Sequence, residues 1–170
     1  MKSQSKLDQI RNNLFTCGKS KNLWNISFNL NTSTDLKNHW LAGFSDADAS
    51  FQIKLINRKG KTEVRLNYEI ARKSDQLLVF IKTYLGGNIG YRKYQDTYYY
   101  GSTSFGSAKN VINYFNLFHM LSNKHVNYLK WRKAYIVLAS HKNKHHLTSD
   151  DLDRITKLKN TMNRSQKNAI

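Results

Sequence analysis

The stretch Leu41–Phe51 reads LAGFSDADASF, and it decides how the rest of the chain is organised. Gly43 and Ala47 are four residues apart, so in a helix they lie on one face, where the backbone of a second helix can approach closely. Asp46 and Asp48 stand at the end of the same run. Polar and apolar residues then alternate, which is the period of a half-buried strand. The sequence therefore predicts a helix that ends where a strand begins, with two carboxylates at the junction.

The charge of the chain favours a polyanionic partner. Its 170 residues, enough for one domain with a core, include 28 Lys and Arg against 11 Asp and Glu, for a net charge of +17. Nucleic acid is the first candidate and a membrane surface the second, but no run reaches the roughly 18 apolar residues of a spanning helix, so no membrane is expected. The single cysteine, Cys17, fits a reducing compartment. Frequent Asn, Lys, Ile and Tyr suggest A/T-rich codons and an organelle genome, with the mitochondrion favoured over the chloroplast.

The residues after the motif predict alternating hairpins and helices. Polar and apolar residues alternate on both sides of a turn at 57–61, which predicts a β-hairpin over 50–70. Helical spacing predicts a helix over Asp75–Leu85, capped by Ser74 and ended by Gly86-Gly87. The further predicted elements are a tyrosine-rich hairpin over Asn88–Ser104 turning near Gln95-Asp96, a helix opened by Gly106-Ser107, a helix over Lys124–Ala139, and a last helix from Thr148 to Met162.

These elements predict an α+β fold of the type αββαββα. The two hairpins pair into a four-stranded antiparallel, saddle-shaped sheet, with helices packed on its apolar face and its charged face left bare. Residues 1–35 are expected to form an N-terminal arm or linker with one short strand at 23–28, residues 36–165 the domain, and residues 166–170 a tail. Thr34-Asp35 is the expected N-cap of the motif helix, and the later helices are expected to bury Leu117, Leu129 and Ile136.

The motif resembles that of the LAGLIDADG homing endonucleases, and the element order over Lys37–Ala139 resembles their core. One position differs, because Ala49 stands where the family usually has Gly. The resemblance implies a site-specific double-strand DNA endonuclease, encoded in a mobile intron, that hydrolyses phosphodiester bonds with Mg²⁺ or another divalent cation. The alternative from the residues alone is a buried helix with two solubilising carboxylates.

The resemblance also implies roles for individual residues. Asp48 and the backbone carbonyl of Ala47 are the expected metal ligands. Asp48 is also an expected catalytic residue, together with Lys124 near the start of a late helix and Arg72 at the end of the second strand, where the family often has Gln. Asp46 is expected to serve the helix end or the interface. A plain surface lysine is the alternative for Lys124.

The bare face of the sheet is expected to bind double-stranded DNA. Lys and Arg neutralise phosphates, and Gln, Asn and Arg can contact base edges, although an ordinary solvated face is the alternative. One such sheet reads a half-site, and for a chain with one motif the resemblance implies a homodimer built on the motif helix through Leu41, Gly43, Phe44 and Ala47. The expected DNA contacts are Gln52, Lys54, Ile56, Arg58, Arg65, Asn67, Glu69, Arg92, Tyr94 and Tyr99.

Two other functions fit the sequence. One is a non-cleaving intron maturase with intron RNA as its partner, and the other is one half of a split two-motif endonuclease. Other clusters of possible ligands are weaker. The histidines at 141, 145 and 146 lack acidic or Cys partners at metal-ligand spacing, so a solvated loop is favoured there. His119 and His125 lack the zinc ribbon that would accompany a His-Asn-His nuclease.

Overall fold

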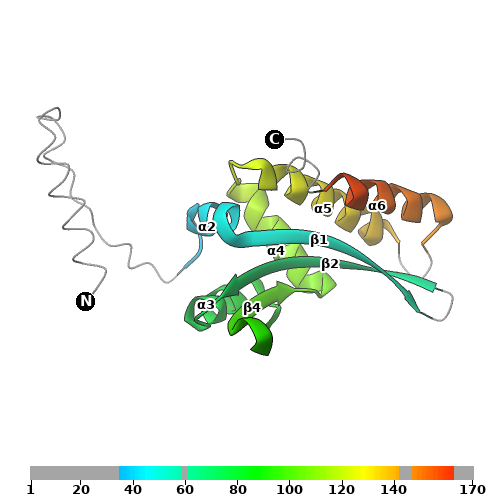
Figure 1. Ribbon diagram of the computed structural model, residues 1–170. Helices are drawn as coiled ribbons and strands as arrows, with labels where there is room; N and C mark the ends of the chain where they lie inside the picture. Colours follow the sequence, from blue (N-terminus) through cyan, green and yellow to red (C-terminus); the bar gives the residue numbers. More distant parts are fainter. Residues whose placement is uncertain (1–34, 59–60, 142–146, 163–170) are drawn as a thin grey trace, which may run out of the picture. The chain divides into compact units, whose positions relative to one another are not determined.

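The computed structural model describes residues 35–58, 61–141 and 147–162. They belong to a unit that begins at Asp35. Its sheet has four antiparallel strands in the order β1-β2-β4-β3 (Figure 1). The predicted α+β fold is thus confirmed. In chain order the elements are α2 (Trp40–Asp48), β1 (Ala49–Arg58), β2 (Lys61–Arg72), α3 (Gln76–Leu85), β3 (Asn88–Arg92), the 3₁₀ turn η1 (Lys93–Gln95), β4 (Thr97–Ser102), α4 (Phe105–Leu117), α5 (Asn123–Ser140) and α6 (Ser149–Thr161).

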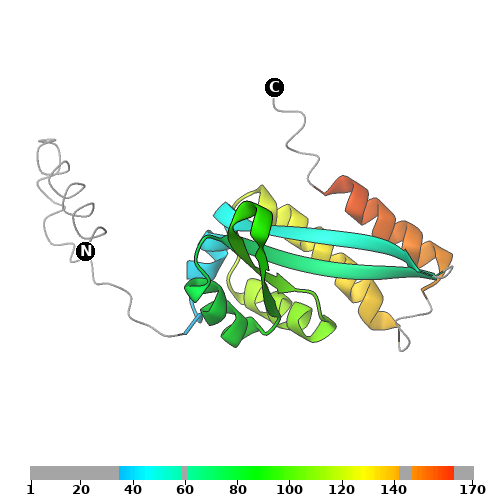
Figure 2. The same ribbon diagram turned by 60° about the horizontal axis from the view of Figure 1, so that its bottom comes forward.

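Alternation along β1 and β2 separates the two faces of the sheet. Phe51 pairs with Tyr68 and Ile53 with Leu66 across the hairpin, and all four side chains are buried. Successive residues of a strand point to opposite faces, so the residues between them lie on the other side of the sheet. Figure 2 shows β1 and β2 crossing in front of α5, which covers their apolar face. The opposite side is the open face of the sheet.

An aromatic cluster joins the sheet to the helices. The Phe51 ring centroid lies 5.0 Å from that of Tyr68, 5.8 Å from Phe115 on α4, and 5.6 Å from both Tyr128 and Trp131 on α5. Tilted and edge-on pairs of this kind contribute about 0.5–1.5 kcal/mol each beyond the burial of their area. The position of β1, and therefore of the helix that leads into it, is fixed by this packing.

Left-handed residues end α3 and turn the second hairpin. Gly86 and Gly87 have φ angles of 74° and 94°, and a Cβ at Gly87 would lie 2.8 Å from the Gly101 carbonyl oxygen. Asp96 has a φ of 46°, and its Oδ1 accepts a 2.7 Å hydrogen bond from the Tyr91 hydroxyl. The predicted helix stop at Gly86-Gly87 and the predicted turn near Gln95-Asp96 are confirmed.

Several predicted helix caps are shifted. The motif helix begins at Trp40 with His39 as its N-cap, so the prediction of Thr34-Asp35 is wrong. Asp75 rather than Ser74 precedes α3, and it makes no side-chain cap bond. Helix α4 is capped by Ser104, two residues before the predicted Gly106. The capping box of α6 between Thr148 and Asp151 is present, as its sequence indicates.

Three apolar residues predicted to be buried are exposed. Leu117 is 73 % exposed, Ile136 51 % and Leu129 37 %. The buried residues of α5 are Tyr128, Trp131, Ala134 and Leu138, which recur every three or four positions. Leu129 and Ile136 lie next to this buried stripe of α5 and are exposed. Leu117 lies outside the buried face of α4.

No helix in the described ranges has the length and apolar character needed to cross a bilayer. The short strand predicted at 23–28, Cys17 and the histidines at 145 and 146 lie outside the described residues.

Candidate active site and nucleic-acid interface

The two motif carboxylates have different partners. Asp46 accepts hydrogen bonds from the Leu121 backbone N–H at 2.7 Å and from the Ser122 hydroxyl at 2.6 Å. Its carboxylate also lies 3.3 Å from the Ser122 backbone nitrogen, which donates to it. Ser122 is the N-cap of α5. Asp46 therefore ties the end of α2 to the start of α5.

Asp48 instead pairs with Arg72. The Arg72 Nη2 contacts the Asp48 Oδ2, which joins the last residue of α2 to the last residue of β2. The guanidinium carbon of Arg72 also lies 4.5 Å from the centroid of the Phe44 ring. Both charged side chains are more than one third exposed, so the pair adds only about 0–1 kcal/mol to stability. Its consequence is positional, because it holds a carboxylate and a guanidinium together at the surface.

Lys124 lies at the end of the motif helix. Its Nζ donates a 2.7 Å hydrogen bond to the carbonyl of Ala47 and a 3.3 Å hydrogen bond to that of Ser45. Carbonyls in the last turn of a helix carry partial negative charge, which suits an ammonium group. Burial lowers the pKa of Lys124, while the charges of Asp48 and Asp46 oppose that shift.

The structure therefore brings the predicted catalytic residues together. Asp48, the Ala47 carbonyl, Lys124 and Arg72 meet where α2 runs into the sheet. Carboxylate and carbonyl oxygens are the donors that Mg²⁺ and Ca²⁺ prefer. Within the described residues no three His, Cys, Asp or Glu side chains form a metal cluster. One chain would thus supply part of a coordination sphere, and both of its donor groups are already contacted by cationic side chains.

Ala49 does not strain the junction. Its φ is −85° and its ψ 160°, which is extended backbone open to any residue. Ala49, in place of the family's usual Gly, therefore adopts the backbone conformation at the junction of α2 and β1 without strain. Ala49 is the first residue of β1, and it is buried.

Two hydroxyl contacts that anchor the motif helix were missed by sequence reasoning. The hydroxyls of Ser45 and Tyr68 lie 2.7 Å apart in the buried interior. The Tyr114 hydroxyl accepts from the Ala42 N–H at 3.2 Å and donates to the Asn38 carbonyl at 2.6 Å. Burial raises the pKa of Tyr114 to about 12. The available signal was the presence of tyrosines at inward positions, since a buried tyrosine hydroxyl needs a partner.

The open face carries most of the predicted DNA contacts. Gln52 lies opposite Asn67 and Lys54 opposite Arg65 in the hairpin register, and Lys54 is exposed. Arg65 Nε donates to Glu63 Oε1 at 2.8 Å. The other members are Ile56, Glu69, Arg92 and Tyr99, with Arg58 as the last residue of β1.

Two of the predicted contacts differ from expectation. Asn67 is only 6 % exposed, so the single chain leaves little of its side chain open to solvent, and its contact with DNA stays a prediction. Its Nδ2 donates to Glu69 Oε2 at 3.3 Å. Tyr94 is fully exposed but belongs to the turn η1 and not to a strand. It therefore stands at the rim of the sheet.

The outer face of α2 is apolar and uncovered in the single chain. Gly43 and Ala47 are exposed, and a Cβ at Gly43 would meet no atom within 4 Å. Trp40, which was not among the predicted interface residues, is 42 % exposed and stacks on Phe44 with 5.2 Å between ring centroids. Leu41 is fully buried in the chain's own core, so its prediction as an interface residue is wrong. It lies on the opposite side of the helix from Gly43.

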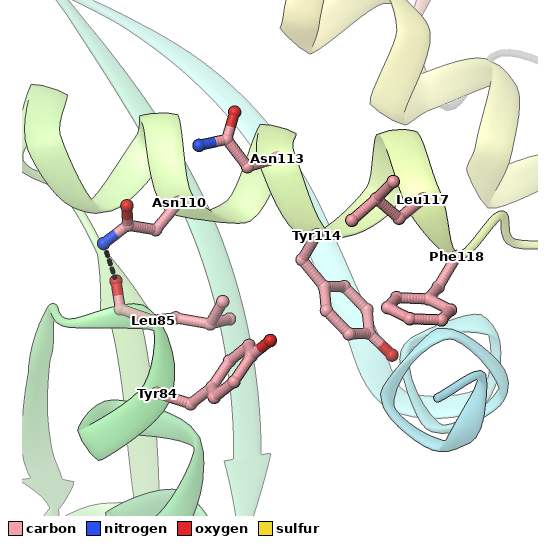
Figure 3. Close-up of a pocket in the computed structure, with 7 residues that line it drawn as sticks. All are labelled: Tyr84, Leu85, Asn110, Asn113, Tyr114, Leu117 and Phe118. Carbon is pink, nitrogen blue, oxygen red and sulfur yellow. Dashed lines mark hydrogen bonds between the residues drawn. The ribbon is translucent and has the colours of Figure 1, made fainter. Parts of the chain in front are cut away.

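A groove of about 230 Å³ lies apart from these residues (Figure 3). Tyr84 and Leu85 at the end of α3 and residues of α4 line it, and Asn110 Nδ2 donates to the Leu85 carbonyl at 3.1 Å. None of the predicted catalytic or DNA-contacting residues lines this groove. The groove is therefore not part of the site formed by Asp46 and Asp48.

Comparison with known proteins gives relatives over most of the chain. It is 59% identical over 157 residues to the uncharacterized cox1 intron-2 37.2 kDa protein of Schizosaccharomyces pombe, covering 92% of this chain and 48% of that protein. It is 31% identical over 160 residues to the intron-encoded DNA endonuclease aI3 of Saccharomyces cerevisiae, covering 76% and 39%. The chain thus spans about half the length, or less, of the curated relatives it matches.

Solved structures share the fold. I-SmaMI bound to uncleaved DNA target in the presence of calcium ions matches with a TM-score of 0.67 and 29% identity, over 73% of this chain and 44% of that one. The homing endonuclease I-TnaI matches in fold with a TM-score of 0.69 and 24% identity, over 76% of this chain and 89% of its own. The family model described as LAGLIDADG endonuclease matches residues 41–135. The chain therefore belongs to the LAGLIDADG endonuclease family.

Proposed function

We propose that this chain is a site-specific, divalent-cation-dependent double-strand DNA endonuclease of the homing type. The observation that carries the proposal is the meeting of Asp48, the Ala47 carbonyl, Lys124 and Arg72 at one point beside an open, basic sheet face. The related I-SmaMI was solved on its DNA target with calcium ions, which supports both partners. The net charge of +17 agrees with a polyanionic substrate.

The open face supplies the binding surface in this proposal. Lys54 and Arg65 would neutralise backbone phosphates, whereas Gln52 would contact base edges in the major groove. Strand β1 has 10 residues and is therefore about 33 Å long, which matches roughly ten base pairs. One chain would read one half of a long target.

The metal site would use the two oxygen donors at the end of α2. Asp48 and the Ala47 carbonyl would hold Mg²⁺ or a similar cation, which when bound polarises a phosphate and activates water. Lys124 would hold positive charge beside the scissile phosphate. Arg72 would exchange its contact with Asp48 for one with phosphate, since a guanidinium suits either anion.

Assembly would complete the site. The exposed face of Trp40, Gly43, Phe44 and Ala47 would pack on a second motif helix, so that a second Asp48-type carboxylate approaches the first. A homodimer fits a chain with one motif. A second domain within a longer protein fits equally, because the matched relatives are about twice as long as this chain.

The source of the gene follows from the relatives. Two of them are named for cox1 introns and others are named as intron-encoded endonucleases. Because cox1 is a mitochondrial gene, the expectation of a mitochondrial genome is confirmed. The target would then be the intronless exon junction into which the intron inserts.

The test is cleavage of a plasmid that carries this exon junction. The chain should linearise it with Mg²⁺ and leave it intact with a chelator or after Asp48→Asn. A parallel filter-binding assay uses the same intron as RNA. Tight binding of the RNA, with no cleavage of the plasmid, would overturn the endonuclease proposal in favour of a maturase.

A further inference from the structure

A row of four residues crosses the open face from β3 to β2. Gly90 and Arg92 come from β3, Tyr99 from β4 and Glu69 from β2. We refer to Gly90, Tyr99, Arg92 and Glu69 as the Arg92 row. Tyr99 lies against Gly90, and Arg92 contacts both Tyr99 and Glu69.

The first contact requires a glycine. The Tyr99 ring lies across Gly90, its register partner in the sheet. A Cβ placed at Gly90 would lie 2.5 Å from the Tyr99 Cζ and 2.5 Å from its hydroxyl oxygen. No side chain can occupy that space while the ring stays there. The Tyr99 ring thus packs directly on the backbone of Gly90, and any larger residue at position 90 would displace the ring.

The second contact places the guanidinium of Arg92. Its central carbon lies 4.6 Å from the Tyr99 ring centroid, and its Nη2 donates a 2.7 Å hydrogen bond to Glu69 Oε1. The other oxygen of Glu69 accepts from Asn67 Nδ2 at 3.3 Å. The Glu69 side chain is 14% exposed and that of Arg92 37%. The carboxylate is therefore enclosed within the row, while the guanidinium reaches solvent.

From these contacts we infer that Arg92 is a base-reading residue for a G·C pair, and that Gly90 and Glu69 are positioning residues for it. This inference rests on the proposed function. An arginine that only neutralises phosphate needs no fixed orientation, whereas bidentate contact with the O6 and N7 of guanine does. The ring beneath Arg92 and the carboxylate beside it supply that orientation before DNA arrives.

The charge balance of the row supports the same role. Glu69 neutralises part of the charge of Arg92. This weakens the attraction of Arg92 to phosphate but favours a residue that must discriminate between bases. A guanidinium has further N–H donors beyond the one used on Glu69. Because its side chain is already held, little additional rotamer freedom is lost on binding.

The experiment compares base preferences of matched variants. The whole chain, in a metal-free buffer that prevents cleavage, selects sites from a pool of random double-stranded oligonucleotides, and competition binding then measures preference at every position. The variants are Gly90→Ala, Glu69→Gln and Arg92→Lys. Gly106→Ala is the control, since an added Cβ there meets no atom within 4 Å. Circular dichroism checks that each variant is folded, and Glu69→Gln keeps the test open if Gly90→Ala is not.

We expect Arg92→Lys to lower the preference for one G·C pair by about 5-fold or more, the discrimination of a bidentate contact. Gly90→Ala and Glu69→Gln should weaken the base preference at the same pair and leave the preference at the other positions unchanged. The control Gly106→Ala should leave the preference unchanged at every position. An unaltered profile in folded Gly90→Ala or Glu69→Gln, or a uniform loss of affinity in Arg92→Lys, would overturn the inference. If the unmutated chain selects no site at all, the proposed function itself is overturned.

Discussion

Asp48 lies at the surface and pairs with the side chain of Arg72, whereas Asp46 accepts hydrogen bonds from backbone N–H groups. We predict that Asp48→Asn abolishes strand cleavage and leaves specific DNA binding largely unchanged. Asn keeps the size and one carbonyl oxygen but loses the charge needed to bind Mg²⁺. A cleavage assay beside a gel shift on the same target measures both. Full cleavage by this variant would remove Asp48 from the chemistry.

Asp46→Ala should show the reverse pattern. The change removes the acceptor for the Leu121 and Ser122 groups, so the free energy of unfolding should fall by about 1–2 kcal/mol. Urea denaturation measures this loss, and cleavage should persist at temperatures where the variant is folded. Loss of cleavage in folded Asp46→Ala at unchanged stability would mean that the two carboxylates have the opposite roles.

We expect Arg72 to compete with a metal cation for Asp48 while DNA is absent. We predict that Arg72→Gln tightens Mn²⁺ binding to the DNA-free protein by up to about 5-fold, the upper worth of an exposed ion pair. Calorimetric titration with Mn²⁺ measures the affinity. Arg65→Gln is the matched control, because that arginine pairs with Glu63 instead. Equal or weaker Mn²⁺ binding by Arg72→Gln would show that the ion pair does not oppose the metal.

At the scale of elements, the open side of β1 should carry the salt-dependent part of DNA binding. Lys54→Gln removes one exposed cation, so the slope of log affinity against log salt should fall by about 1. Fluorescence anisotropy over a salt series measures the slope. Lys157→Gln, on the exposed side of α6, should leave it unchanged. A larger effect at Lys157 than at Lys54 would place the binding surface on the helices.

The elements themselves could be predicted because their signals are local. Alternation at Phe51 and Ile53 gave the strands, and Gly86-Gly87 gave the helix stop. The exposed Leu117 was assigned wrongly because which stripe of a helix is buried depends on its packing partner, and composition alone does not state this. The N-cap His39 was missed because it makes no side-chain cap bond, so the residue types that signal a cap are not present there.

The site could be predicted only in part. The motif pointed to Asp48, and the resemblance at the start of a late helix pointed to Lys124, but their contacts join residues 77 apart (Lys124 to Ala47) or 24 apart (Arg72 to Asp48) in the chain. The periodicity of apolar residues in a sequence does not indicate which distant residues come into contact. Leu41 was assigned to the interface because it belongs to the same motif as Gly43 and Ala47. In a helix, however, only residues three or four positions apart share a face.

For the whole molecule, the exposed face of α2 predicts assembly. We predict a dimer whose formation Gly43→Leu disrupts, because a bulky side chain keeps two helix backbones apart. The chain's own fold should tolerate the change, since a Cβ at Gly43 meets nothing within 4 Å. Sedimentation velocity at micromolar concentration measures the mass. Gly106→Leu, at an equally open glycine on α4, is the control and should remain a dimer.

A monomeric unmutated chain, both free and on DNA, would contradict the dimer. It would leave the second motif helix to a further domain, in keeping with the greater length of the relatives.

The alternation along β1 and β2 also affects how such a protein changes over generations. Residues such as Phe51 and Tyr68 are constrained by the packing of the core; if the open face binds DNA as proposed, Gln52 and Lys54 are constrained by the DNA sequence instead. A codon change at an outward position can therefore alter the recognised site without reopening the packing beneath it. When an intron meets a diverged host gene, its lineage can follow the new sequence through mutations on one side of a hairpin.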